Sequence, residues 1–222
     1  MVCEMFSWIL LSSVYAQPCA DYERPKLLLR VNAEELVESS GLAASQFRPD
    51  FFYSHNDSGA EPALFGFSTQ GGRVEKWPLN TLDAEDWEDM ASGPCPSSGE
   101  SKCLFLGDIG DNLRRRKSVQ IYAIPERSEG PQNQQVGRWD LSYPSGPEDA
   151  ETLLVHPTTG RVYVVTKRSE GPVVYRAPKK PSSGQWEKVA ELNEDRMGLR
   201  IPKLTGGDFS RDGRRVVLRG YL

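Results

Sequence analysis

Short apolar runs separated by clusters of Gly, Pro, Asp and Ser recur along most of the chain. Runs of this kind, rich in β-branched and aromatic residues, are typical of β-strands. The longest helical candidates are short, at residues 32–37 and 82–90. The pattern therefore predicts an all-β protein. The predicted strands are residues 50–54, 63–68, 73–77, 102–107, 119–124, 152–156, 161–166, 173–177 and 215–220.

Tight turns are predicted just before three of these strands. The turns contain Gly71, Gly160 and Gly213. Glycine supplies the positive φ that short hairpin turns need, so each of these positions favours a hairpin between neighbouring strands.

A longer unit also recurs, in which a polar or acidic cluster leads through an apolar strand and a turn into a second strand with a polar end. Its copies begin at residues 38, 86, 149 and 205. The first three copies continue into a third strand with a central aromatic residue. This order is typical of β-propeller blades, whose inner strands line a channel. Residues 216–221 are interpreted as an inner strand without hairpin partners. We therefore expect an incomplete propeller of about three blades plus the start of a fourth.

The order of the motifs HNDSG, DWED, GDIGDN, DAETL and GGDFS resembles a group of secreted, largely uncharacterised β-propeller proteins. These are similar in style to the phytase-like and gluconolactonase-like propellers. The resemblance covers about residues 38–222 and lies in the order of the motifs more than in any one of them. It implies a propeller scaffold but no particular activity, because function depends on the site that a scaffold carries.

The N-terminus resembles a secretory signal peptide, with an apolar core at residues 5–11 and a cleavage site after Ala16. Glu4 stands where a basic residue is expected, so a misassigned start or a buried first strand stays open. The apolar run is far shorter than the ~20 residues that span a bilayer, and we expect no membrane span. We expect a secreted or extracytoplasmic protein. Its predicted parts are the signal peptide at 1–16, an N-terminal segment at 17–34 and the partial propeller at 35–222.

Four cysteines occur in the chain, and Cys3 would leave with the signal peptide. Cys95 and Cys103 flank a flexible polar loop and are predicted to form a local disulfide in an oxidising compartment. Zinc binding is the rival interpretation, but neither a CxxC pair nor a nearby histidine accompanies them. Cys19 is then a free thiol or has its partner outside this chain.

The charge of the chain argues against a nucleic-acid partner. Its 222 residues include 27 Lys and Arg and 31 Asp and Glu, a formal net charge of −4. A protein held by phosphate contacts normally shows a basic face, whereas the only basic run here, residues 114–117, is interpreted as a solvated loop. A nucleophilic hydrolase is also disfavoured, because no Gly-x-Ser-x-Gly motif is present.

Matching positions of the repeat are the best candidates for a functional site, since inner strands of a propeller converge on a shared channel. Such strands and the strands after them are antiparallel. Their polar residues therefore lie near opposite ends, or close together if the loops fold over. The candidates at the starts of the inner strands are Glu38, Glu88, Asp89, Glu151 and Asp208. The candidates at the ends of the second strands are His55, Asn56, Asp57, Asp108, Asp111, Asn112, Lys167 and Arg219.

Calcium is the predicted cofactor. Asp108, Asp111 and Asn112 place three oxygen-bearing side chains within the motif GDIGDN, where Gly110 permits a sharp bend, and hard cations prefer such ligands. The alternative is an Asx turn, in which the same groups accept hydrogen bonds from backbone N–H groups. The predicted metal ligands are Asp108, Asp111, Asn112, Glu88 and Glu151.

The remaining candidates have other roles. Glu88 and Asp89 would point in opposite directions on a strand, so only one need face the channel, and the pair could instead join one blade to the next. His55 and Glu88 are candidates for acid–base work. Lys167 and Arg219 are predicted to bind an anion.

Two functions follow from these predictions. The first is a secreted propeller that binds a small molecule, a glycan or a protein at a polar central-channel site. The second is a calcium-dependent hydrolase of a small anionic ester or lactone, in which the ion activates water.

Overall fold

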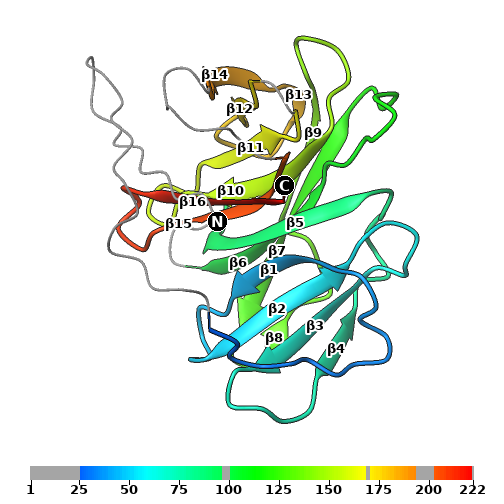
Figure 1. Cartoon of the computed structure of the whole chain (residues 1–222), viewed down its shortest axis with the longest axis vertical. Helices are drawn as coiled ribbons and strands as arrows, with labels where there is room; N and C mark the ends of the chain where they lie inside the picture. The colour runs from blue at the N-terminus through cyan, green and yellow to red at the C-terminus, as the bar shows by residue number, and fades with distance from the viewer. Residues whose placement is uncertain (1–25, 97–100, 169–170, 194–202, 222) are drawn as a thin grey trace.

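The computed structural model describes residues 26–96, 101–168, 171–193 and 203–221, and all regular elements in these ranges are β-strands (Figure 1). The predicted signal peptide and Cys19 lie outside the described residues. The two helical candidates were wrong: residues 32–37 contain only a turn, and residues 82–90 lead through bends into a strand. Among the described residues, no helix is long and apolar enough to cross a membrane.

Three antiparallel meanders follow one another along the chain. The first contains β1 (Ser39–Ala44), β2 (Phe51–Asn56), β3 (Ala63–Ser68) and β4 (Glu75–Pro78). The second contains β5 (Trp87–Pro94), β6 (Lys102–Asp108), β7 (Val119–Arg127) and β9 (Gly137–Ser142). The third contains β10 (Ala150–Val155), β11 (Val162–Thr166), β12 (Val173–Arg176) and β14 (Glu187–Glu191). A two-stranded sheet of β15 (Lys203–Phe209) and β16 (Val216–Tyr221) follows.

The first strand of each sheet packs beside the first strand of the next, so β1 contacts β5, β5 contacts β10, and β10 contacts β15. The sheets fan out from these inner strands (Figure 1). The described residues thus form three blades of a β-propeller and the first two strands of a fourth. One detail differs from the prediction: residues 216–221 form the second strand of the fourth blade, because β15 is the strand that packs against β10.

Two short strands complete the architecture. β8 (Gly130–Pro131) pairs with the end of β7. β13 (Ser183–Gln185) lies between β12 and β14 in the sequence but pairs in parallel with β9 of the second blade. A strand from the segment of the third blade therefore extends the outer edge of the second blade. Its hydrogen bonds to β9 connect the two blades.

Separate apolar clusters fill the spaces between successive blades, because alternate residues of a strand point to opposite faces of its sheet. In β6, Leu104 and Leu106 face the cluster shared with the first blade, while Phe105 faces the cluster shared with the third. A third cluster, which includes Leu154 and Leu218, lies between the third and fourth blades. The blades are therefore joined mainly by buried apolar surface.

Two local predictions are confirmed. Cys95 and Cys103 form a disulfide with a Cα–Cα distance of 5.0 Å at the turn end of the β5–β6 hairpin. Gly71, Gly160 and Gly213 have φ angles of 87°, 62° and 69°, the region that favours glycine in tight turns.

Candidate functional site

Bulges at the starts of the inner strands present acidic side chains. The pairing of β5 with β6 skips Glu88, and the pairing of β10 with β11 skips Glu151. A bulged residue leaves the regular ladder, and its side chain is re-aimed relative to the strand. Glu88 and Glu151 thus occupy equivalent bulges in consecutive blades.

The strand registers bring the start of each inner strand to the end of the following strand. Trp87 pairs with Asp108, Ala150 with Thr166, and Ser39 with Asn56. Of the two arrangements that the sequence left open, the structure has the one in which both sets of polar residues share one end of the blades.

An aspartate precedes each bulged glutamate by two residues, in the segments Asp86–Glu88 and Asp149–Glu151. Asp57, which directly follows β2 of the first blade, adds a fifth carboxylate. We call these five residues the acidic cluster: Asp57, Asp86, Glu88, Asp149 and Glu151.

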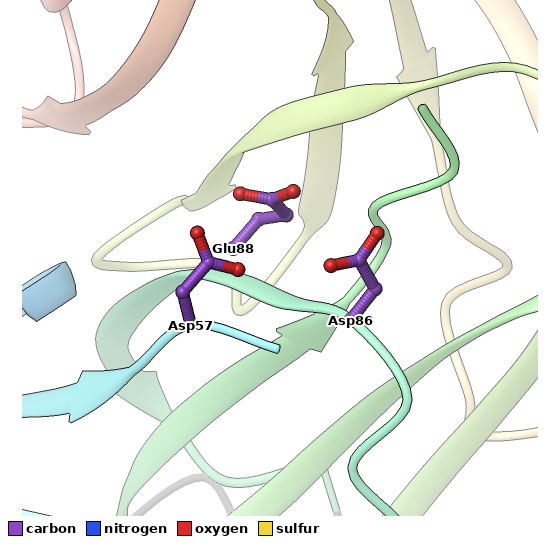
Figure 2. Close-up of side chains that lie close together, drawn as sticks. All are labelled: Asp57, Asp86 and Glu88. Atoms are coloured by element: carbon purple, nitrogen blue, oxygen red, sulfur yellow. The ribbon is translucent and has the colours of Figure 1, made fainter. Parts of the chain in front are cut away.

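The acidic cluster consists of two groups of three carboxylates that share Glu88. One group is Asp57, Asp86 and Glu88, and the other is Glu88, Asp149 and Glu151. In each group, one ligand atom per residue lies within 4.8 Å of the others. Figure 2 shows the first group, whose carboxylates point toward one another from the end of β2, the segment before β5, and β5 itself. Two oxygens on opposite sides of a calcium ion lie about 4.6–5.2 Å apart, so the spacing of each group suits such an ion.

Glu88 is the most enclosed member of the acidic cluster. The residue is only 5% exposed. Within the described part of the chain, its carboxyl group has no hydrogen bond or ion pair. Burial, followed by the charges of Glu151 and Asp57, raises the pKa of Glu88 to about 9. Burial and the charge of Asp57 also raise the pKa of Asp86, to about 6. A bound cation would lower the pKa values of both Glu88 and Asp86, because it favours their ionised forms.

Gly110 leaves room for two carboxylates of the second blade. A Cβ atom at this position would lie 2.4 Å from Oδ2 of Asp86 and 2.5 Å from Oε1 of Glu88. The sequence suggested that Gly110 permits a sharp bend, but its φ is not among the positive values. The close approach of the carboxylates is the physical reason for glycine here.

Three other members of the acidic cluster have a partner. The ammonium group of Lys167 pairs with Oε1 of Glu151. Asp149 accepts a 3.0 Å hydrogen bond from the backbone N–H of Asp111, and Asp57 accepts one of 2.6 Å from Ser58. Within the cluster, the carboxyl groups of Glu88 and Asp86 have no hydrogen bond or ion pair to the described residues, and Glu88 is the more deeply buried of the two.

Three of the predicted calcium ligands lie outside the acidic cluster. Asp108 accepts hydrogen bonds from two backbone N–H groups before β5 and forms an ion pair of 2.7 Å with Arg116. Asp111 accepts bonds of 2.8 Å from the backbone N–H groups of Arg115 and Arg116, so its carboxylate caps backbone N–H groups as the alternative proposed, although four and five residues on and not in an Asx turn. Asn112 is exposed. Of the predicted set, the structure brings together only Glu88 and Glu151.

Asp89 joins the second blade to the third. Its carboxylate accepts 2.9 Å hydrogen bonds from the backbone N–H groups of Met90 and Leu153. Glu88 and Asp89 therefore divide the two roles considered for the pair, since Glu88 faces the acidic cluster and Asp89 links the blades.

His55 and Arg219, the remaining candidates, make contacts that support the fold. His55 is fully buried, hydrogen-bonds the carbonyl oxygen of Asn56 at 2.8 Å through Nδ1, and packs edge-on against Trp87. Burial lowers its pKa. The guanidinium of Arg219 donates to the carbonyl oxygen of Thr205 at 2.6 Å. Among the described residues, neither His55 nor Arg219 forms a hydrogen bond or ion pair with the acidic cluster.

Sequence reasoning did not assign Asp57, Asp86 and Asp149 to a metal site. The available signal was the repeated Asp-x-Glu pattern at the starts of two consecutive copies of the repeat. Equal positions in neighbouring blades are spatial neighbours, so this repetition is more informative than the short spacing within GDIGDN.

Comparisons with known proteins give distant structural likenesses. No protein-family model and no curated protein matches the chain. Its structure is similar to the Dos1 propeller, with a TM-score of 0.44, 12% identity, and coverage of 82% of this chain and 42% of that chain. It is also similar to the hydrazine synthase of Kuenenia stuttgartiensis, with a TM-score of 0.44, 12% identity, and coverage of 81% and 55%. The chain spans about half the length of these solved chains.

Proposed function

We propose that this protein is a propeller binding module that holds a divalent cation, Ca²⁺ by preference, in the acidic cluster. The observation that carries the proposal is the carboxyl group of Glu88, which is enclosed, has no partner among the residues that the structure describes, and lies in two groups with four other carboxylates. A buried charged group is normally paired or bound to a metal ion, because an uncompensated one is costly.

Charge and ligand type support calcium. Five carboxylates and the ammonium of Lys167 carry a net charge of −4 when all are ionised. Carboxylate oxygens suit hard cations such as Ca²⁺ and Mg²⁺, whereas zinc and copper sites usually include His or Cys. Ca²⁺ accepts irregular sets of six to eight oxygen ligands, and Mg²⁺ demands a near-ideal octahedron. Ligands from three separate blades favour the more tolerant ion.

The bound ion would also serve as the contact point for the ligand of the module. Calcium in a site at the end of the blades can complete its coordination with oxygen atoms of a bound small molecule, glycan or protein. We also propose that the protein acts in an extracytoplasmic compartment, where the Cys95–Cys103 disulfide would persist.

Isothermal titration calorimetry of the full chain with CaCl₂ tests the proposal. We expect saturable binding to the wild-type protein and at least tenfold weaker binding to Glu88→Gln. Glu187→Gln is the matched control, since Glu187 is an exposed glutamate on β14, outside the acidic cluster. The proposal fails if millimolar CaCl₂ produces no saturable heat with the wild-type protein, or if Glu88→Gln binds as well as the control.

A second candidate function is calcium-dependent hydrolysis of a small anionic ester or lactone. The observation that favours it is the difference between two neighbouring carboxyl groups, with a pKa of about 6 for Asp86 and about 9 for Glu88. Pairs of carboxyl groups with separated pKa values are typical of acid–base catalysis. Turnover of lactones or phosphate esters that needs CaCl₂ and is lost in Asp86→Asn would support hydrolysis. Calcium binding without any turnover would argue against hydrolysis and favour the binding module.

A further inference from the structure

We infer that the acidic cluster is a dinuclear site in which the carboxylate of Glu88 bridges two divalent cations. The inference rests on the proposed function, because it specifies how many ions the same cluster holds. Its basis is that Glu88 belongs to two complete three-carboxylate groups, one with Asp57 and Asp86, and the other with Asp149 and Glu151.

Each group by itself has the dimensions of a cation site. The ligand atoms within a group lie no more than 4.8 Å apart, which lets one ion contact all three. The groups draw on different blades. Asp57 comes from the first blade, Asp149 and Glu151 come from the third, and Glu88 lies between them on the inner strand of the second. One ion placed in either group leaves two carboxylates of the other group without a cation.

The charge of the site also favours two ions. The five carboxylates and Lys167 sum to −4 when ionised, so one divalent cation leaves −2 and two neutralise the site. Uncompensated charge is costly in a place where Glu88, Asp149 and Glu151 are all less than a tenth exposed.

Glu88 is the member best suited to bridge. Within the described residues its carboxyl group has no hydrogen bond or ion pair, so both oxygens are available. By contrast, oxygens of Asp57, Asp149 and Glu151 accept bonds from Ser58, Asp111 and Lys167, respectively.

Gly110 allows the carboxylates of the first group to take up their positions. Any side chain there would strike Oδ2 of Asp86 and Oε1 of Glu88. Two cations that share a carboxylate lie about 3.5–4 Å apart in known two-metal sites. At that separation, each ion could still contact the three carboxylates of its own group.

Mn²⁺ tests the inference, because it binds oxygen sites and two ions that share a carboxylate give an exchange-coupled electron paramagnetic resonance spectrum. We expect calorimetry with MnCl₂ to give two ions per wild-type chain and the loaded protein to show the coupled spectrum. Asp57→Asn should lose the first ion and Asp149→Asn the second, each leaving one ion with an uncoupled six-line spectrum. Glu88→Gln should weaken both sites at least tenfold and abolish coupling, whereas Glu187→Gln should behave as the wild type.

The outcomes separate the two proposals. One ion per wild-type chain, or two ions without coupling, would overturn the dinuclear site and leave the cation-binding module. No Mn²⁺ and no Ca²⁺ bound would overturn both. Circular dichroism of each variant establishes that it is folded, and Asp57→Asn keeps the test decisive if Asp149→Asn does not fold, because Asp57 is only half-buried.

Discussion

Glu88 and Glu151 occupy equivalent bulges in consecutive blades, and their carboxylates approach within 4.8 Å of each other. Two like charges at this distance repel, more strongly when they are buried than in water. The same bulge in two blades nevertheless directs both side chains to one place. The proposed cation, shared by the two blades, would offset this repulsion when both carboxylates are ionised.

The space at Gly110 gives the first prediction. Gly110→Ala should weaken calcium binding at least tenfold and destabilise the fold by about 1–3 kcal/mol, because the added methyl group displaces the carboxylates of Asp86 and Glu88. Calcium calorimetry and urea unfolding measure the two effects. Gly184→Ala is the control, since a Cβ at Gly184 meets no atom within 4 Å. Unchanged calcium binding in Gly110→Ala would contradict the account of this loop.

The raised pKa of Glu88 gives a pH dependence of stability. Its pKa of about 9 exceeds the unfolded value of 4.5, so the folded state holds the proton more tightly and protonation stabilises the fold. Without calcium, this stabilisation should be complete below about pH 4.5 and lost as the pH rises through about 9. Thermal unfolding of wild-type protein and Glu88→Gln across this range isolates the effect. Identical pH dependence of the two proteins would argue against a buried, protonated Glu88, and calcium should raise wild-type stability most at the alkaline end.

Lys167 competes with cations for Glu151. Its ammonium group is a tethered positive charge on one of the proposed ligands, so Lys167→Gln should strengthen calcium binding several-fold. Arg168→Gln is the matched control, because Arg168 pairs with Glu148, which is not part of the acidic cluster. Calorimetry at constant ionic strength compares the variants. Weaker calcium binding in Lys167→Gln than in Arg168→Gln would show that Lys167 supports the site instead of competing with the ion.

Asp89 should affect stability without affecting calcium stoichiometry. Asp89→Asn places an amide N–H₂ group where the backbone N–H of Met90 or of Leu153 needs an acceptor. The free energy of unfolding should therefore fall by about 1–3 kcal/mol. Urea unfolding with calcium present measures this loss. Asp212→Asn is the control, because Asp212 also accepts a backbone N–H, from Arg214, but is exposed. Equal stability of the two variants would refute the role of Asp89 as a link between blades.

The sequence predicted the second and third strands of the blades better than the first and fourth ones, and it missed β9 and β14. Third strands such as β3 and β12 are short apolar runs with clear turns at their ends, and these were located within a residue or two. β5 was missed and partly assigned to a helix. Its start, at Trp87, Glu88 and Asp89, contains two adjacent acids and a bulge, which break the alternation expected of a strand.

For the site, residues close together in the sequence were a poorer guide than residues that the fold brings together. The acids of GDIGDN are close together in the sequence, but Asp108 and Asp111 are occupied by backbone N–H groups of nearby segments. The acidic cluster instead combines Asp57 with Asp149, which only the packing of three blades brings together. Spacing along the chain could not reveal this, whereas the repetition of Asp-x-Glu pointed to equivalent positions.

A crystal of the full chain grown with MnCl₂ would show by anomalous diffraction whether manganese binds at the acidic cluster. We expect an anomalous peak there, about 2.0–2.6 Å from a carboxylate oxygen of Glu88 and within coordination distance of at least two other members of the cluster. A crystal that shows manganese elsewhere on the protein, with no peak beside Glu88, would contradict this expectation.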